Sequence, residues 1–160
     1  MRIAVLSDTH LKAGRSLPRL VWEHLSDADL ILHAGDLTHK ELVDELSLVA
    51  PVKAVCGNCD DWTVDLPSQE WVECESFKFG IIHGHQGKGK TTLERAYSAF
   101  ESNHVDVIVF GHSHTPTLKC HNGVLMFNPG SPTDKRREPQ YSFGWLEVQE
   151  GHINAKHIYF

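Results

Sequence analysis

Short apolar runs alternate with longer amphipathic stretches through the first two thirds of this 160-residue chain. This alternation is typical of βαβ units, in which helices separate the buried strands of a largely parallel sheet. It predicts the order β-α-β-α-β over residues 2–56 and then two strands, a helix and a buried strand. Strands are expected at Arg2–Leu6, Leu30–His33, Val52–Cys56, Trp71–Glu75, Phe77–Ile82 and Val105–Phe110, and helices at Leu17–Leu25, Lys40–Val49 and Thr91–Ser102.

The pattern changes beyond Gly111, where apolar and polar residues alternate as in strands with one solvent-facing side. Asn-Gly and Glu-Gly dipeptides separate two pairs of such segments and favour tight hairpin turns. We find no internal repeat, linker or low-complexity segment, so a single domain over residues 1–160 is expected. The predicted antiparallel hairpins pair Leu118–His121 with Val124–Phe127 and Tyr141–Val148 with His152–Tyr159.

Polar side chains that commonly bind metals follow five of the predicted strands directly. Since ligands bind beyond the carboxyl ends of strands in open α/β sheets, these side chains are expected to share one crevice. Carboxylate and imidazole ligands without thiolate suit Mn, Fe, Zn or Ni. Seven ligands are too many for one ion, so two ions roughly 3.5–4 Å apart are expected, as used for in-line displacement at phosphorus. The candidate ligands are Asp8, His10, Asp36, Asn58, His83, His112 and His114.

The spacing of these residues supports a shared site. Asp8 and His10 are two positions apart, so they point the same way on an extended segment. A glycine directly before Asp36, Asn58 and His112 lets the backbone turn sharply and approach the metals. Each motif alone also occurs by chance, as a turn or a solvated histidine. Their order, each after its own strand, favours a metal centre.

Taken together, the motifs resemble the pattern D-x-H, G-D, G-N-[HC]-D, H and G-H-x-H of the calcineurin-like metallophosphoesterases. A later Asn-Pro-Gly-Ser segment is similar to a turn of the small single-domain phosphodiesterase branch, which also contains the retromer's metallophosphoesterase-like subunit. The resemblance implies an α/β fold of two facing β-sheets flanked by helices, a four-layer α-β-β-α sandwich. The matching segments are Asp8-Thr9-His10, Gly35-Asp36, Gly57-Asn58-Cys59-Asp60, His83, Gly111-His112-Ser113-His114 and Asn128-Pro129-Gly130-Ser131.

The resemblance also implies roles for the candidate ligands. One ion would be held by Asp8, His10 and His114, the other by Asn58, His83 and His112, and Asp36 would bridge them. A hydroxide between the ions would attack phosphorus in line. The implied activity is that of a metal-dependent phosphoesterase, first of all a phosphodiesterase, acting on a small phosphate ester. Mn²⁺ is the first choice of metal, with Ni²⁺, Fe²⁺, Zn²⁺ and Mg²⁺ as alternatives.

Cys59 stands where many family members have a histidine that stabilises or protonates the leaving oxygen. A thiol replaces it poorly, and general acid catalysis contributes about 10²–10⁴-fold. His85, two residues after His83, is the candidate catalytic proton donor; the alternative is a histidine that supports a ligand or faces solvent. His33, just before Gly35-Asp36, is a second candidate for a supporting role.

Two alternatives to a phosphodiesterase remain. Residues 84–91, GHQGKGKT, match the P-loop pattern G-x-x-x-x-G-K-[ST] between a predicted strand and a predicted helix. A P-loop nucleotide hydrolase also needs an Asp after a neighbouring strand, and the next strand ends in Gly111-His112 instead. The loop amides, with Lys88 or Lys90, remain candidates for contact with a substrate phosphate. The other alternative is a catalytically weak or inactive scaffold of the same fold that binds partner proteins.

The net charge and the cysteines limit which binding partners and which cellular compartment are expected. The net charge is −6 and Lys135-Arg136-Arg137 is the one basic run, so stable nucleic-acid binding is not expected. The apolar runs are too short for a membrane span, and Asp8 interrupts the first one before a signal peptide develops. The four cysteines therefore indicate reduced thiols and a cytoplasmic location. A homo-oligomer is compatible with the sequence, because symmetric dimers are the commonest assemblies of soluble proteins.

Overall fold

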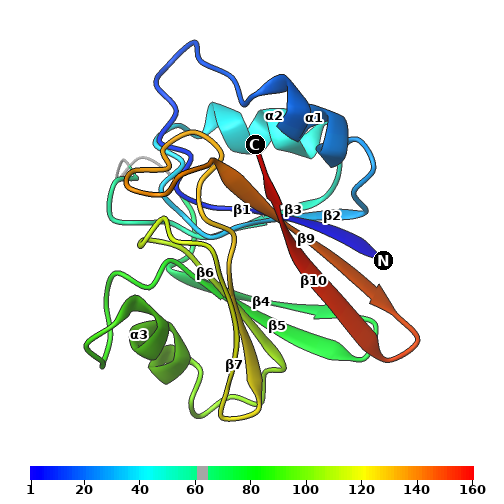
Figure 1. The fold of residues 1–160 in the computed structure, drawn as a ribbon, viewed down its shortest axis with the longest axis vertical. Coiled ribbons are helices and arrows are strands. Elements are labelled where there is room, and N and C mark those ends of the chain that lie inside the picture. The colour runs from blue at the N-terminus through cyan, green and yellow to red at the C-terminus, as the bar shows by residue number, and fades with distance from the viewer. Residues whose placement is uncertain (61–64) are drawn as a thin grey trace.

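The computed structural model describes residues 1–60 and 65–160, arranged as two five-stranded β-sheets that face each other (Figure 1). Two helices cover the outer face of one sheet and the third covers the outer face of the other. This confirms the predicted four-layer α-β-β-α fold. The elements are β1 (Arg2–Leu6), α1 (Arg19–Leu25), β2 (Leu30–His33), α2 (Glu41–Ser47), β3 (Val52–Ala54), β4 (Gln69–Cys74), β5 (Phe77–Ile82), α3 (Thr92–Ala99), β6 (Val107–Phe110), β7 (Thr117–His121), β8 (Val124–Asn128), β9 (Ser142–Gln149) and β10 (His152–Tyr159).

The first sheet has the strand order β10-β9-β1-β2-β3. β1, β2 and β3 are parallel, with Leu6 opposite His33 and His33 opposite Ala54, so their carboxyl ends lie at the same edge. β9 and β10 run antiparallel to them. All four residues of β2 are buried, which explains the uninterrupted apolar run that predicted it.

The second sheet has the order β4-β5-β6-β8-β7. β5, β6 and β8 are parallel, with Ile82 opposite Phe110, whereas the edge strands β4 and β7 are antiparallel. The expectation of one largely parallel sheet over the first two thirds is therefore wrong in detail. The chain leaves the first sheet after β3, and both sheets are mixed. Apolar periodicity predicts that a strand exists but does not indicate which sheet it joins.

Both predicted hairpins are confirmed, with β7–β8 in the second sheet and β9–β10 in the first. Their turns have left-handed backbone at both central residues, with φ of 51° at Asn122 and 83° at Gly123, and 50° at Glu150 and 75° at Gly151. Positive φ at both positions matches the right-handed twist of the paired strands. The hairpins lie at neighbouring positions in the sequence but complete different sheets.

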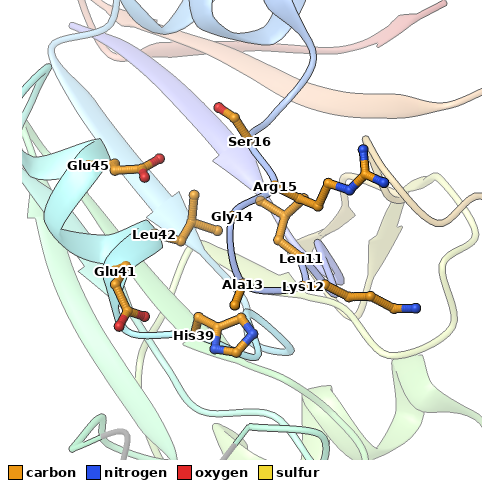
Figure 2. A pocket seen from close by; sticks show the side chains of 10 residues that line it. All are labelled: Leu11, Lys12, Ala13, Gly14, Arg15, Ser16, His39, Glu41, Leu42 and Glu45. Carbon is orange, nitrogen blue, oxygen red and sulfur yellow. The ribbon is translucent and has the colours of Figure 1, made fainter.

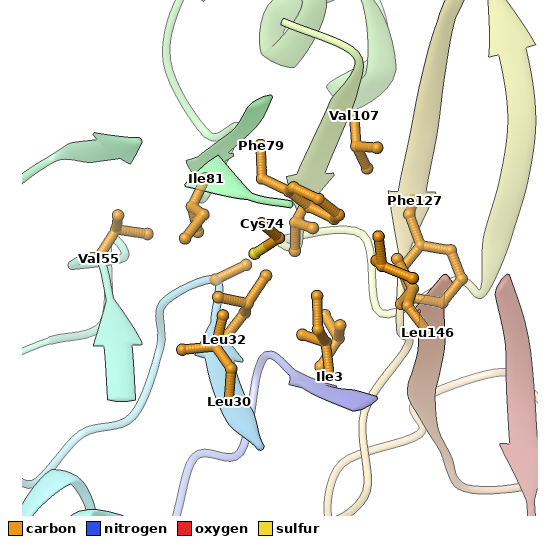
Figure 3. Packing of buried hydrophobic residues seen from close by; sticks show 14 residues of the cluster. Ile3, Leu30, Leu32, Val55, Cys74, Phe79, Ile81, Val107, Phe127 and Leu146 are labelled. Carbon is orange, nitrogen blue, oxygen red and sulfur yellow. The ribbon is translucent and has the colours of Figure 1, made fainter. Parts of the chain in front are cut away.

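A buried apolar cluster holds the two sheets together (Figure 3). Ile3 and Leu32 from the first sheet meet Phe79, Val107 and Phe127 from the second, and all five are fully buried. Each such side chain contributes about 1.5–3 kcal/mol by leaving water. This packing fixes the carboxyl ends of the parallel strands of one sheet against those of the other.

The helices are shorter than predicted. α1 begins at Arg19 rather than at Leu17, because Pro18 before it is extended. Thr91 caps α3, because its hydroxyl accepts the Glu94 amide at 3.1 Å. Among residues 1–60 and 65–160 no helix has the length and apolar character needed to cross a membrane.

Candidate metal centre

Loops from both sheets meet beyond the carboxyl ends of β1, β2, β5 and β6. The His10 amide donates to the Asp36 carbonyl at 3.0 Å, which joins the loops after β1 and β2. Across the sheets, the His112 amide donates to the Asp8 carboxylate at 3.0 Å. The Gly111 amide donates to the His83 carbonyl at 3.1 Å. The predicted convergence of strand ends is therefore observed, although the strands belong to two sheets.

Five of the seven candidate ligands form a tight cluster of carboxylate oxygens and ring nitrogens. Asp36 Oδ2 lies 3.5 Å from His10 Nε2 and 3.3 Å from His83 Nε2. Asp8 Oδ1 lies 3.4 Å from His114 Nε2. His10 Nε2 and His114 Nε2 are 3.2 Å apart. Asp36 thus lies between two histidines, in the place expected of a bridging ligand.

The other two candidates lie beside this cluster. Asn58 Oδ1 is 3.1 Å from His83 Nε2. The His112 ring packs edge-on against the His83 ring, with centroids 5.2 Å apart. Within the described ranges, Asp8-His10-His114 and Asp8-Asp36-His83 are groups whose ligand atoms all lie within 4.8 Å of one another. His112 is outside these groups, so the structure places it less closely than the rest.

Hydrogen bonds to the backbone orient two of the histidines. His83 Nδ1 lies 2.7 Å from the Ala34 carbonyl, and His114 Nδ1 contacts the Asp134 carbonyl. A carbonyl only accepts, so each Nδ1 carries the proton and donates it. The Nε2 lone pairs then face the carboxylates of Asp8 and Asp36. Lone pairs facing carboxylates repel unless a metal cation or a proton lies between them, so this donor set fits divalent metals, with the carbonyls orienting the ligands.

The pKa values of Asp8, Asp36 and His83 also fit a site that attracts positive charge. Burial raises the pKa of Asp8 above its ordinary value, against the opposing charges of His83 and His114. Burial also acts to raise the pKa of Asp36, but its hydrogen bond and charge interaction with His83 outweigh this and lower it. For His83, burial acts to lower the pKa and the two carboxylates raise it above the ordinary value. When no cation is bound, a proton on His83 balances the negative charge of the Asp8 and Asp36 carboxylates.

Left-handed backbone is concentrated at the candidate ligands. Five of them have positive φ: Asp8 (53°), His10 (42°), Asp36 (58°), His112 (67°) and His114 (58°). Such conformations in residues other than glycine cost about 1–3 kcal/mol each and occur often at functional sites. The surrounding hydrogen bonds must hold each of these residues in place.

The glycines before Asn58 and His112 allow close approach. A Cβ on Gly57 would overlap the Asp36 carboxylate, and a Cβ on Gly111 would overlap the Ser7 hydroxyl. Neither has a positive φ, unlike Gly35 at 93°. Of the two roles expected from the sequence, Gly35 has the sharp backbone turn. Gly57 and Gly111 have the close approach of the backbone to a neighbouring side chain.

Asp60 is a functional residue whose role sequence analysis missed. Its Oδ2 accepts the amides of Asp36 at 2.9 Å and Gly57 at 2.6 Å, and its Oδ1 accepts the Thr38 amide at 2.7 Å. One carboxylate therefore connects the loops after β2 and β3 that carry Asp36 and Asn58. Its place in the G-N-C-D motif was the available signal.

Further polar side chains fix Asp8 and its surroundings. The Ser7 hydroxyl donates to Asp8 Oδ2 at 2.7 Å, and the Ser131 hydroxyl donates to the Asp8 carbonyl at 2.7 Å. The Asn128 amide donates to the Gly111 carbonyl at 2.9 Å. The Asn-Pro-Gly-Ser turn therefore supports the site directly, which the sequence indicated only through resemblance.

His33 has the supporting position considered from sequence. Its Nδ1 accepts the Gly35 amide at 3.2 Å, so Nε2 carries the proton and donates to the Thr9 hydroxyl at 3.2 Å. Burial lowers the pKa of His33 to about 3, so the ring is neutral. It connects the loops after β1 and β2 without facing the cluster.

His85, the candidate proton donor, lies next to the cluster. Its ring centroid is 5.3 Å from that of His83 and 6.1 Å from that of His112. Its Nδ1 is buried and has no hydrogen-bond partner among the residues that the structure describes. Burial and the charge of His83 lower its pKa. His85 therefore has an unused ring nitrogen beside the candidate ligands.

Cys59 lies on the open side of the cluster. Its amide donates to Asp36 Oδ1 at 2.8 Å, and its side chain is exposed. Its sulfur, a ring nitrogen of His10 and a carboxylate oxygen of Asp36 lie within 4.8 Å of one another. Burial and the nearby carboxylates, Asp36 first, raise the pKa of the thiol.

The glycine-rich loop over residues 84–91 connects β5 to α3 but is not arranged as a phosphate-binding loop. The Glu94 carboxylate accepts the amides of Lys90 at 2.7 Å and Thr91 at 3.0 Å, and Thr91 accepts the Glu94 amide. These donors at the start of α3 are therefore satisfied by the chain itself. This argues against both the P-loop alternative and the suggested contact of these amides with a phosphate.

A cavity of about 340 Å³ lies between the loop over residues 11–16 and the beginning of α2 (Figure 2). Leu11 and Leu42 provide apolar lining, and Glu41 and Glu45 line it from α2. The Thr38 hydroxyl donates to the Leu11 carbonyl between the two walls. Its walls follow His10 and Asp36 in the sequence, but none of the seven candidate ligands lines it.

Carboxylates and imidazoles gather where the parallel strands of two facing mixed sheets end. This arrangement is typical of metal-dependent hydrolases of phosphate esters, so we compared the chain with that class of protein. Residues 1–151 match the calcineurin-like phosphoesterase superfamily domain. The chain belongs to this superfamily, as the sequence motifs predicted.

Individual relatives agree with this assignment. A protein named "Probable metallophosphoesterase" from Methanothermobacter thermautotrophicus is 39% identical over 138 residues, which cover 85% of this chain and 80% of that protein. "Phosphodiesterase MJ0936" from Methanocaldococcus jannaschii is 28% identical over 144 residues, 81% of this chain and 83% of that protein. The crystal structure of wild-type Vps29 complexed with Zn²⁺ from Entamoeba histolytica superposes with a TM-score of 0.79, at 25% identity and 99% coverage of each chain.

Proposed function

We propose that this protein is a metal-dependent phosphodiesterase that hydrolyses a small phosphate diester at the cluster around Asp36. One observation carries the proposal: the Nε2 atoms of His83 and His114 face the carboxylates of Asp36 and Asp8, with each Nδ1 occupied by a backbone carbonyl. Membership of a phosphoesterase superfamily and the relative named as a phosphodiesterase support it.

The proposed ligand sets are those that the family resemblance implies, and the geometry supports several of their members. Asp36 is shared between two ions because it lies between His10 and His83. When bound, two divalent cations supply Lewis-acid activation of water and neutralise the charge that develops at phosphorus. Mn²⁺ is the first candidate, because the donors are oxygens and imidazole nitrogens. The first set is Asp8, His10 and His114, and the second is Asn58, His83 and His112.

We assign proton delivery to His85. Its buried Nδ1 is not used elsewhere in the described part of the chain, and its ring stands beside His83 and His112. The leaving alkoxide needs a proton, and positioned histidines supply one in many hydrolases. Its lowered pKa makes the neutral ring dominant at pH 7, so turnover of esters with poor leaving groups is expected to be slow.

The organic part of the ester has a candidate position in the cavity beside the loop over residues 11–16. A volume of about 340 Å³ is within the range of small-molecule sites. Lys12 and Arg15 extend from the loop on the side away from α2 (Figure 2), where they are candidates to attract an anionic ester. Their charge offsets the overall negative charge of the chain. A cytoplasmic location is part of this proposal.

The test is hydrolysis of an activated aryl phosphodiester by metal-stripped protein, with and without added Mn²⁺, Ni²⁺ or Mg²⁺. We expect metal-dependent turnover in the wild type that falls to background in Asp36→Ala and His112→Ala. The exposed His152, on β10, provides a matched control, and His152→Ala should keep the wild-type rate. Metal-dependent turnover that survives in Asp36→Ala would contradict the proposed centre.

A scaffold that binds partner proteins is the second candidate. The likeness to Vps29 over 99% of each chain favours it, as does Cys59 in a position where a proton-donating histidine is common in the family. A folded protein that binds Mn²⁺ but hydrolyses no phosphodiester with any ion would support the scaffold instead of the enzyme.

A further inference from the structure

We infer that Cys59 is itself a metal ligand, which with His10 and Asp36 forms a three-donor site for a thiophilic divalent ion such as Zn²⁺ or Cd²⁺. This inference rests on the proposed metal centre and extends it. The ligand set suggested by the sequence contains no sulfur. The structure places a thiol within 4.8 Å of a ring nitrogen of His10 and a carboxylate oxygen of Asp36.

The distances fit a tetrahedral ion. Ligand bonds to Zn²⁺ of about 2.0–2.3 Å separate neighbouring donor atoms by about 3.5 Å. His10 Nε2 and Asp36 Oδ2 are 3.5 Å apart, so this pair needs no movement. Cys59 supplies the third corner after a side-chain rotation, which is open to it because the side chain is exposed.

The backbone of Cys59 is fixed where the third ligand is needed. Its amide donates to Asp36 Oδ1 at 2.8 Å, leaving Oδ2 facing His10. The Asn58 side-chain amide donates to the Cys59 sulfur at 3.3 Å, on the side of the second proposed ion. This contact holds the sulfur at the rim of the centre, and the rotation that brings the sulfur to the third corner exchanges the contact for a bond to the ion.

The donor set predicts which ions use this site. Thiolate, imidazole and carboxylate are all zinc ligands, and three protein ligands with a fourth position open to water are typical of catalytic zinc sites. Mn²⁺ and Mg²⁺ prefer oxygen ligands and gain little from sulfur. When a thiophilic ion binds, the thiol proton passes to solvent and the thiolate becomes the ligand. His10 and Asp36 belong to both arrangements, so the two kinds of ion compete for them.

The test is titration of metal-stripped protein with Cd²⁺, recording the ultraviolet thiolate-to-cadmium charge-transfer band and, by calorimetry, the affinities for Cd²⁺ and Mn²⁺. We expect the band in the wild type and its loss in Cys59→Ser. The Cd²⁺ affinity should fall by about tenfold or more, whereas the Mn²⁺ affinity should change by less than about threefold. Cys56→Ser and Cys120→Ser are matched controls that should keep the band.

Alkylation provides a measurement on the wild-type protein. Cd²⁺ or Zn²⁺ should slow the reaction of Cys59 with iodoacetamide, and Mn²⁺ should not. Cadmium that binds without a charge-transfer band, or a band that persists in Cys59→Ser, would overturn the inference. If Mn²⁺-dependent turnover is present without the band, only the role of Cys59 fails. If neither ion binds the wild type, the proposed metal centre fails as well.

Discussion

Among the carboxylates of the candidate centre, Asp8 and Asp36 face the proposed metals, whereas another holds the backbone that carries the ligands. Asp60 belongs to the second kind, since its two oxygens accept three backbone amides from two loops. Carboxylate acceptors form stronger hydrogen bonds with backbone amides than neutral acceptors do. The position of Asp36 therefore depends on a side chain that does not need to touch an ion.

Asp60→Asn should weaken metal binding by about 10–100-fold, because one side of the amide group can no longer accept the loop amides. The measurement is calorimetric titration of metal-stripped protein with Mn²⁺. Asp44→Asn, an exposed position on α2, is the control and should bind like the wild type. An unchanged affinity in Asp60→Asn would show that the loops hold their shape without this carboxylate.

His157 makes folding stability depend on pH. Burial lowers its pKa, and its Nε2–H donates to the Asn128 carbonyl at 2.7 Å. The unfolded chain, with an ordinary pKa near 6.5, therefore binds more protons than the folded chain below that value. Stability should be fully present above pH 6.5 and decrease as the pH falls below it.

The prediction is tested by urea unfolding of wild type and His157→Gln at pH 8 and pH 5, both with a chelator present. The loss of unfolding free energy between the two pH values should be smaller in the variant. Burial lowers the pKa of His33 to about 3, so His33 also contributes to the loss of unfolding free energy. This contribution is the same in both proteins and cancels when their losses are compared. Equal losses would remove His157 as a cause.

At the scale of elements, the loops after the strands are shaped by contacts too close for a side chain. Gly57→Ala should abolish Mn²⁺ binding, because the added Cβ would overlap the Asp36 carboxylate. Gly123→Ala is a control in the β7–β8 turn, where a Cβ meets nothing within 4 Å. It should cost about 1–3 kcal/mol of stability through its positive φ but keep the metal affinity. Calorimetry and urea unfolding separate the two effects.

The elements show how far the sequence could predict the structure. Every predicted strand and helix of the described residues exists, because long apolar runs and Asn-Gly turns are local signals. α2 ends at Ser47, before its predicted end, where local turns lead into Pro51. β3 ends at Ala54, and beyond it the Cys56 amide donates to the Pro67 carbonyl. The seven candidate ligands were predicted because they directly follow five of the strands. Asp60 and Ser131 were missed because their roles depend on partners elsewhere in the fold.

At the scale of the whole molecule, the proposed centre joins the two sheets, since its ligands follow strands of both. Bound metal should therefore stabilise the complete fold. At a free Mn²⁺ concentration of 100 times the dissociation constant, the gain is about 2.7 kcal/mol, and a chelator should remove it. Thermal unfolding with Mn²⁺ and with chelator measures the gain, and Asp36→Ala should show none. A wild-type protein whose thermal stability does not change with chelator would contradict this prediction.

That residues 1–160 form one domain stays a prediction, as does self-association of the protein.

The pairing of β1 with both β2 and β9 has a consequence for synthesis. All seven candidate ligands have been translated once residue 114 leaves the ribosome, but β9 ends only at Gln149. Until then β1 lacks one of its two neighbours, and pairings across such long sequence separations form slowly. We therefore expect the proposed metal centre to form only after β9 has paired with β1. The ions available after this pairing, rather than those met earlier in synthesis, are then the ones that the proposed centre takes up.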